Sequence, residues 1–244
     1  MSKTVLLLDG DLILYRNAIA CEREVKWDNE NWVLWCNEEN AWSNIQAHIG
    51  HLQTKLKSDK ALLVFSEGRS FRYDLTPTYK ANRSDTRKPL GYASLVERAK
   101  ETYECRSFPN LEADDVMGLL ATKPGKERRI VVSEDKDMKT IPGLLYRKGE
   151  LVEVSETEAD YWHLYQTLIG DTADGYAGLP GCGPKTAEKI LKDAEYQWQA
   201  VVNAFIKKGL TATDALLQAR LARILRWSDW DNTKKEVKLW TPSK

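Results

Sequence analysis

Acidic residues recur at five separated points of this 244-residue chain, each just after an apolar run. They are Asp9, Glu67, the cluster Glu112, Asp114 and Asp115, the pair Asp135 and Asp137, and the pair Asp171 and Asp174. If the runs are neighbouring strands of a parallel sheet, their carboxyl ends meet at one edge, where open α/β sheets place their sites. Nine carboxylates in one cleft repel one another unless divalent cations neutralise them. The pattern therefore predicts two-metal hydrolysis of phosphodiester bonds.

Each acidic position also has a purely structural interpretation. A single carboxylate after a strand, such as Asp9, is more often a helix cap, and acids at a helix start such as Glu112 suit the helix dipole. Neither effect explains five recurrences, three acids within four residues, or the alternate pair in Ser133-Glu134-Asp135-Lys136-Asp137. The combination favours metal ligands over caps.

A glycine-rich turn runs from Gly178 to Thr186 and opens a helix. Small residues let backbone N–H groups approach a phosphate, and a helix start with a lysine adds positive potential. An ordinary helix–turn–helix joint is the alternative. Because an acid pair precedes the turn, we expect it to bind a DNA backbone through Gly181, Gly183, Lys185 and Thr186.

A basic stretch with interleaved aromatic residues follows Glu67. A charge run is usually a solvated face. On a helix, however, Lys80 and Arg83 would present two cations on one side, while Tyr79 offers a ring on which a base could stack. We expect Arg69, Arg72 and Tyr79 to contact DNA.

Charge and composition limit the class of protein. Lysine and arginine number 36, as do aspartate and glutamate, and setting aside the nine clustered acids leaves 36 positive against 27 negative charges, a net charge of +9. A negative cleft in a positive rim suits a polyanion. The four scattered cysteines predict neither a zinc site nor disulfides. With no signal peptide and no membrane-length apolar run, we expect a soluble, intracellular protein.

The pattern of elements predicts an α/β fold with a mainly parallel central sheet flanked by helices. Buried strands are expected at 5–8, 61–65, 129–132 and 144–147, with helices between them. The segment 22–42 is expected to be an excursion or hairpin whose tryptophans pack. From Pro184 onward the chain is expected to be helix only. We expect a nuclease core over 1–157, with a short basic helical gateway at about 69–100, and a helical part over 158–244.

These motifs together resemble the 5′ nucleases of the flap endonuclease superfamily, and within it most resemble the 5′→3′ exonucleases of T-seven-like phages. The similarity covers nearly the whole chain in the same order. Its hallmarks are Leu8-Asp9-Gly10, Tyr79-Lys80-Ala81-Asn82-Arg83, Glu112-Ala113-Asp114-Asp115, Ser133 to Asp137, and Gly170 to Asp174 with the glycine turn behind it.

The resemblance implies a hydrolase that removes nucleotides from 5′ ends of duplex DNA, cuts 5′ flaps and degrades RNA in RNA–DNA hybrids. Carried over by motif, Asp9, Glu67, Glu112 and Asp114 would hold a first metal, Glu67 through water because it stands where many relatives have Asp. Asp115, Asp135, Asp137, Asp171 and Asp174 would complete that site and serve the second. Lys80 and Arg83 would contact the scissile phosphate as catalytic cations at the foot of a short gateway.

The implied cofactors are two Mg²⁺ ions, for which Mn²⁺ can substitute, and a K⁺ ion at a helix-hairpin-helix-like turn. The implied setting is DNA replication by a monomer without membrane contact, in the cytoplasm of the bacterial host if a bacteriophage encodes it. Two alternatives stay open. PIN-type ribonucleases also gather acids at strand ends but lack the glycine turn, and a non-catalytic DNA-junction module would have neutral residues among the acids, of which the sequence has none.

Overall fold

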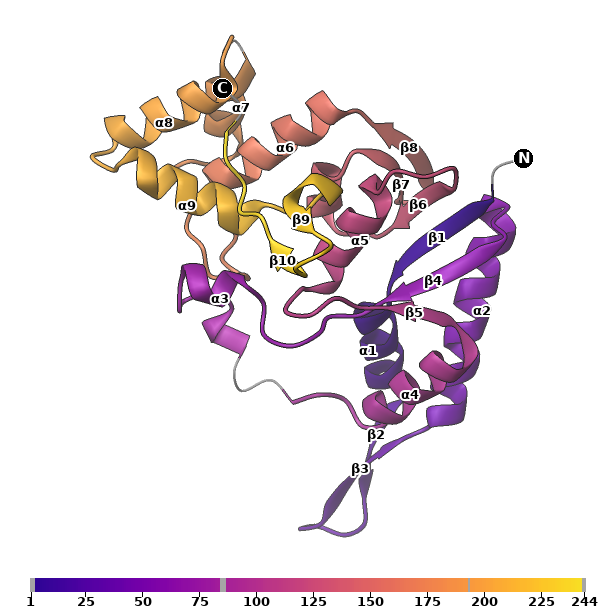
Figure 1. The fold of residues 1–244 in the computed structure, drawn as a ribbon. Helices are drawn as coiled ribbons and strands as arrows, with labels where there is room; N and C mark the ends of the chain where they lie inside the picture. The colour runs from indigo at the N-terminus through magenta and orange to yellow at the C-terminus, as the bar shows by residue number, and fades with distance from the viewer. Residues whose placement is uncertain (1–2, 84–86, 193, 243–244) are drawn as a thin grey trace.

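The structure is a computed structural model that describes residues 3–83, 87–192 and 194–242. Its centre is a six-stranded sheet in the order β5-β4-β1-β6-β7-β8, in which every neighbouring pair except β7–β8 is parallel (Figure 1). The strands are β1 (Thr4–Asp9), β4 (Lys60–Val64), β5 (Glu104–Arg106), β6 (Arg128–Val132), β7 (Gly143–Arg147) and β8 (Glu150–Val154). The four predicted strands are present, and β5 and the antiparallel edge strand β8 are additional.

Helices cover both faces of the sheet (Figure 1). One face packs against α1 (Gly10–Ala20), α2 (Glu38–Leu56) and α4 (Tyr92–Thr102), and the other against α5 (Ala113–Thr122). Successive residues of β1 enforce this division, because Leu6 and Leu8 join the first core while Val5 and Leu7 join the second. The α/β fold with a mainly parallel sheet is thus confirmed.

The helices α6 (Glu156–Ile169), α7 (Pro184–Lys192), α8 (Gln197–Lys207) and α9 (Ala212–Ala222) form a separate apolar core. The expectation of helix alone after Pro184 is wrong, since η3 (Trp227–Asp229), β9 (Trp230–Asp231) and β10 (Glu236–Val237) follow. Ile224, Leu225 and Trp230 pack into the α5 side of the sheet core. The end of the chain therefore returns to the α/β core instead of extending the helical part.

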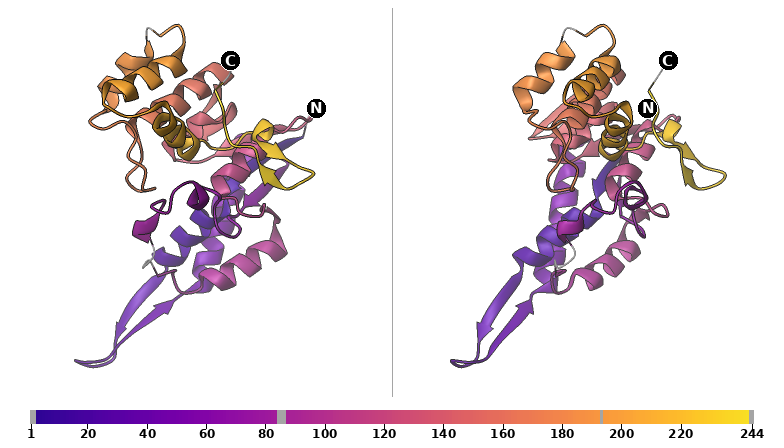
Figure 2. Two further views of the ribbon diagram at one scale, coloured as in Figure 1. Left: turned by 60° about the vertical axis from the view of Figure 1, so that its left-hand side comes forward. Right: turned by 90° about the vertical axis from the view of Figure 1, so that its left-hand side faces the viewer.

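The hairpin β2 (Glu22–Lys26) and β3 (Trp32–Cys36) projects away from the body of the molecule (Figure 2). The prediction of a hairpin is confirmed, but the prediction that its tryptophans pack is wrong for three of them. Trp27, Trp32 and Trp35 are 74%, 58% and 51% exposed, whereas Trp42, on α2, is buried. A two-stranded ribbon has no second layer to cover its faces, which explains the exposure.

The basic stretch is not one helix. It forms α3 (Arg72–Leu75), a turn over 77–80 and the 3-10 helix η1 (Ala81–Arg83), with Lys80 at a φ of 49°. The predicted gateway helix is therefore absent over the described residues before Tyr92. In the ranges that the structure describes, no helix is long and apolar enough to cross a membrane.

Candidate active site

The site lies where the strand order reverses, beside β1 at the centre of the sheet. Asp9 is the last residue of β1, and its Oδ1 accepts the backbone N–H of Leu12 at 2.9 Å, which caps α1. The structural role expected of a single carboxylate thus exists. Burial, with the charge of Asp11 as a smaller contribution, nevertheless raises the pKa of Asp9 to about 6. The hydrogen bond of a helix cap alone would favour the charged carboxylate and lower its pKa. The raised pKa of Asp9 is therefore unusual for a cap.

The start of α5 brings two further acids to Asp9. Glu112 precedes α5 and Asp114 lies in its first turn. Burial and then the charges of Asp9, Asp135 and Glu112 raise the pKa of Asp114 well above its usual value. Burial would also raise the pKa of Glu112, but the Arg72 and Lys80 cations outweigh it and lower that pKa to about 2. Protein cations thus compensate the charge of Glu112, whereas the charge of Asp114 is not compensated.

The two remaining acid pairs come from loops after β6 and α6. Asp135 accepts the N–H of Asp137 at 2.8 Å, so the alternate acids form one turn. Asp171 accepts the N–H groups of Ala173 and Asp174. Burial and the charges of Asp135, Asp171 and Asp174 raise the pKa of Asp137 to about 7. The two pairs, far apart in sequence, therefore share one electrostatic environment.

A small cavity joins these segments. It is lined by acids from three places in the chain, Glu112 and Asp114, Asp137, and Asp174, together with Lys80. Four of the nine predicted acids line this cavity, and three more, Asp9, Asp135 and Asp171, lie close enough to raise the pKa of Asp114 or Asp137. Asp115 and Glu67 have other partners.

Lys80 stands inside this cluster. Its Nζ donates to Glu112 and lies 3.6 Å from Asp174, and its backbone N–H donates to the carbonyl of Asp174 at 2.9 Å. Arg83 ends η1, and its side chain lies outside what the structure describes. Lys80 is thus placed where negative charge is concentrated.

Tyr79 does not offer a ring to a base, so this prediction is wrong. Its side chain is 2% exposed, packs against Tyr73 at 5.5 Å and donates its hydroxyl to Glu112 at 2.8 Å. Burial raises its pKa. Tyr79 instead orients Glu112.

Asp115 and Arg72 form a buried pair, which corrects two further predictions. Asp115 is fully buried and accepts two hydrogen bonds from Arg72 at 2.6 and 2.8 Å and a third from the N–H of Leu225. Arg72 also donates to Glu112 and to the carbonyls of Leu221 and Arg223. With its charge fully used within the protein, Arg72 cannot reach DNA, and Asp115 cannot reach a metal. The pair joins α3, α5 and the C-terminal segment.

Glu67 also lies outside the cluster. It is exposed and accepts the Ser107 hydroxyl at 2.5 Å. Ser66 faces the site instead, since its N–H donates to Asp11 and its hydroxyl accepts from the N–H of Ala113. Successive residues of an extended chain face opposite sides, so Glu67 faces away from the site when Ser66 faces it. The prediction that Glu67 is a metal ligand is therefore wrong. Arg69 is exposed and pairs with Asp74, so its DNA contact stays a prediction.

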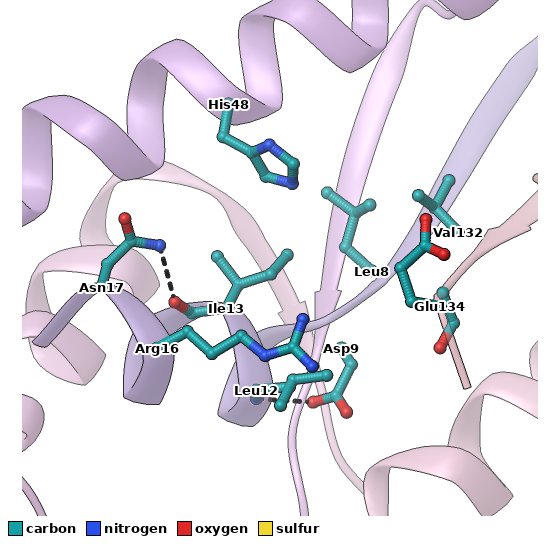
Figure 3. Close-up of a pocket in the computed structure, with 10 residues that line it drawn as sticks. Leu8, Asp9, Leu12, Ile13, Arg16, Asn17, His48, Val132 and Glu134 are labelled. Atoms are coloured by element: carbon teal, nitrogen blue, oxygen red, sulfur yellow. Dashed lines mark hydrogen bonds between the residues drawn. The ribbon is translucent and has the colours of Figure 1, made fainter. Parts of the chain in front are cut away.

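Two residues of α1 that the sequence reasoning missed line clefts around Asp9. Asp11 lies in the cleft with Asp9, Lys80 and Glu112, where it accepts the hydroxyl of Tyr92 at 2.7 Å. Arg16 lines a second cavity with Asp9 and His48, and Figure 3 shows its side chain directed toward Asp9. Its position two helical turns after Asp9 was the available signal.

The glycine-rich turn packs tightly at its start and opens toward its end. A Cβ on Gly178 would stand 2.4 Å from the backbone N of Gly170, whereas a Cβ on Gly183 would meet nothing within 4 Å. Lys185 and Thr186 lie exposed in the first turn of α7. The structure thus leaves Gly181, Gly183, Lys185 and Thr186 accessible, and their contact with DNA stays a prediction.

The cluster fits hard divalent cations by its donors. All are carboxylate oxygens, which Mg²⁺ prefers. Among residues 3–83, 87–192 and 194–242, no three acidic, histidine or cysteine side chains close around one point; Lys80 instead lies between Glu112 and Asp174. The raised pKa values of Asp9, Asp114 and Asp137 come from burial and mutual repulsion, which a divalent cation would relieve.

Comparison with known sequences decides the family. Residues 4–160 match the 5′-3′ exonuclease, N-terminal resolvase-like domain. The exodeoxyribonuclease of Enterobacteria phage T3 is 32% identical over 283 residues, covering 98% of this chain and 93% of the relative. The chain belongs to the 5′-3′ exonuclease family. The exonuclease of Escherichia phage T7, also 32% identical, covers 98% of this chain and 94% of its own length.

Solved structures of similar fold agree with this family. The 5′-exonuclease of T5 with bound zinc superimposes with a TM-score of 0.66 at 15% identity, covering 90% of this chain and 89% of that one. The catalytic core of Rad2, solved with a DNA substrate, gives a TM-score of 0.51 at 12% identity, covering 85% and 66%. At such identities the likeness shows the shared fold alone.

Proposed function

We propose that this protein is a metal-dependent 5′→3′ exonuclease and structure-specific 5′ flap endonuclease that hydrolyses duplex DNA and RNA in RNA–DNA hybrids. The observation that carries the proposal is the gathering of seven carboxylates from four segments around Lys80 at the switch point of the sheet. Family membership supplies the reaction class, and the relatives of T3 and T7 are named as exonucleases.

The acids divide into two neighbouring groups that would each hold one Mg²⁺ or Mn²⁺ ion. Asp9, Glu112 and Asp114 form the first group, and Asp135, Asp137, Asp171 and Asp174 form the second. When bound, such ions supply a water of lowered pKa and stabilise charge on the phosphate and the leaving oxygen. The buried Asp115 would not be a ligand, because both of its oxygens accept hydrogen bonds from Arg72 and none of its surface is exposed.

Lys80 would donate to the scissile phosphate. In the structure its ammonium is held by Glu112, and Tyr79 and Arg72 also donate to that carboxylate. A phosphate oxygen would compete with Glu112 for Lys80, while Tyr79 and Arg72 keep the carboxylate in place. Arg83, three residues later, would contact the same or the next phosphate.

The duplex would bind beside the acid cluster on the turn that opens α7. Gly181 and Gly183 would let the backbone approach closely, with Lys185 and Thr186 meeting the phosphate, and the same turn would hold a K⁺ ion. The exposed Arg69 would add a further cation. We propose that the protein acts as a monomer.

A cleavage assay tests the proposal. A duplex with a recessed 5′ end and a matched 5′ flap substrate are labelled at the 5′ end and incubated with Mg²⁺ or with EDTA. Short labelled products with Mg²⁺ and none with EDTA are expected, and a 3′ label should instead report progressive shortening. Binding without cleavage in Mg²⁺ and in Mn²⁺ would favour a non-catalytic junction module. Cleavage confined to single-stranded RNA would favour a PIN-type ribonuclease.

A further inference from the structure

A separate cleft lies between α6, the start of α8 and the C-terminal segment. Its lining includes three aromatic residues, two arginines and a serine: Tyr196, Trp198, Trp240, Arg223, Arg226 and Ser228. Its volume of about 760 Å³ is ample for a nucleotide-sized ligand. None of the predicted metal ligands lines it.

Two guanidinium groups of this cleft carry unpaired hydrogen-bond donors. Within the described residues, Nη1 of Arg223 and Nε of Arg226 are buried and have no partner. Arg223 is 5% exposed, so its donor cannot be satisfied by bulk water. An unmade hydrogen bond of a buried charged group is costly, and such groups call for a ligand or a bound ion.

Both side chains are fixed in position. Nε of Arg223 donates to Asp229 at 2.8 Å, and its carbonyl accepts from Arg72. Arg226 is held by Asp160 at 2.8 Å and by the carbonyl of Thr140. The donors therefore cannot turn away to solvent. Burial, with the charges of Arg223 and Arg226, lowers the pKa of nearby His163 to about 3.

The lining also includes aromatic rings. Tyr196 is 72% exposed, and Trp198 packs edge-on against Trp240 with ring centroids 5.2 Å apart. A ligand in the cleft would have both guanidinium groups and aromatic rings within its lining. Those are the contacts that a phosphate and a nucleobase make.

We propose that this cleft binds a nucleoside monophosphate, with its phosphate at Arg223 and Arg226 and its base against Tyr196 and Trp198. The binding needs no cleavage and no divalent metal, so it stands apart from the proposed nuclease activity.

The test is calorimetric titration of the whole protein with dAMP, deoxyadenosine and inorganic phosphate in EDTA, which keeps the metal site from capturing the nucleotide. We expect saturable binding of dAMP, weaker binding of phosphate, and affinity for deoxyadenosine at least about tenfold lower than for dAMP. A short oligonucleotide without terminal phosphates is the fourth ligand, and its binding in place of dAMP would reassign the cleft to a DNA backbone.

Substitutions at two exposed positions test the binding of the phosphate and of the base separately. Ser228→Glu places a carboxylate beside the guanidinium groups and should weaken dAMP and phosphate binding by about tenfold or more, whereas Ser43→Glu on α2 should change neither. Tyr196→Ala should weaken dAMP binding alone, with Trp27→Ala on the distant hairpin as its control.

Equal binding of deoxyadenosine and dAMP, full dAMP affinity in Ser228→Glu, or no dAMP binding at concentrations on the order of 10 mM would overturn the proposal. None of these outcomes depends on cleavage, so a failure here leaves the nuclease assignment untouched.

Discussion

At the residue scale, the acidic side chains near the sheet edge differ in their partners. Asp115 has every oxygen committed to Arg72 and Leu225, and it is fully buried. Asp9, Asp114 and Asp137 are crowded by other acids, and their pKa values are raised. The first kind of acid stabilises the fold, and the second kind is the one that we propose as metal ligands.

Lys80 is the cation most closely placed for catalysis. Lys80→Ala should lower the single-turnover cleavage rate by roughly a hundred- to a thousandfold, because it removes a preorganised donor where charge develops on the phosphate. Affinity for DNA should change little. Rapid-quench kinetics on a recessed duplex measure both quantities, with Lys100→Ala on α4 as control. A loss of affinity with an unchanged rate would reassign Lys80 to docking.

At the element scale, the loop between α6 and α7 carries an acid pair at its start and, at its end, the turn that we propose binds DNA. The backbone pairs between Asp171 and Tyr176 and from Leu179 to Leu168 hold it in place. Gly170 and Gly178, both at positive φ, allow the two strands of the loop to touch.

Gly178→Ala tests this loop. The added Cβ would collide with the backbone at Gly170 and Leu168 and strain a φ of +63°, so we expect a stability loss of about 1–3 kcal/mol and a displaced acid pair. Gly183→Ala, where a Cβ meets open space, should keep full stability. Urea denaturation compares the two variants, and equal stabilities would show that the close packing is not needed.

Lys185 tests the far end of the same loop. Lys185→Ala should weaken duplex binding and reduce the slope of log affinity against log salt by about one unit, because one phosphate contact is lost. Lys126→Ala, in the exposed loop before β6, is the control. Fluorescence anisotropy over a salt series measures the slope, and an unchanged slope would make the turn a plain helix joint.

The sequence predicts the features that arise from neighbouring residues better than those that arise from contacts between distant residues. Apolar runs such as Val5–Leu8 and the acids that follow them are local signals, so the main strands and the clustering of acids could be predicted. The pairing of Arg72 with Asp115 joins residues 43 positions apart, and the burial of Tyr79 depends on Tyr176 and Leu221. Neither contact leaves a periodic signal, which is why the wrong role was predicted for Arg72, Asp115 and Tyr79.

At the scale of the whole molecule, the C-terminal segment ties the helical part to the sheet. Leu225 and Trp230 enter the sheet core, while Arg223 and Arg226 face His163 and Asp160 of α6 and Asp229 of η3. His163 is fully buried beside these cations and bonds the carbonyl of Ala219 at 2.8 Å. The burial of His163 therefore depends on the contact between α6 and the C-terminal segment.

Lowering the pH should weaken the contact between α6 and the C-terminal segment. Burial and then the two arginines lower the pKa of His163 from 6.5 to about 3, so its contribution to stability is full above pH 6.5 and falls as pH drops toward 3. The loss is roughly 1.4 kcal/mol per pH unit within that window. The stability difference between wild type and His163→Gln should shrink by about 2 kcal/mol between pH 7 and pH 5 in urea denaturation. A difference that stays constant would contradict a buried neutral His163.

We propose that the acid cluster binds catalytic metals, whereas the neighbouring Asp115 does not. The most direct measurement compares Asp135→Asn with Asp115→Asn for Mg²⁺-dependent cleavage and for stability in EDTA. Asp135→Asn should nearly abolish cleavage yet keep or raise stability, because it removes a repelled charge. Asp115→Asn should lose about 3–5 kcal/mol of stability, because it leaves Arg72 buried without its partner. Wild-type cleavage by Asp135→Asn, or its unfolding in unchanged buffer, would contradict the account.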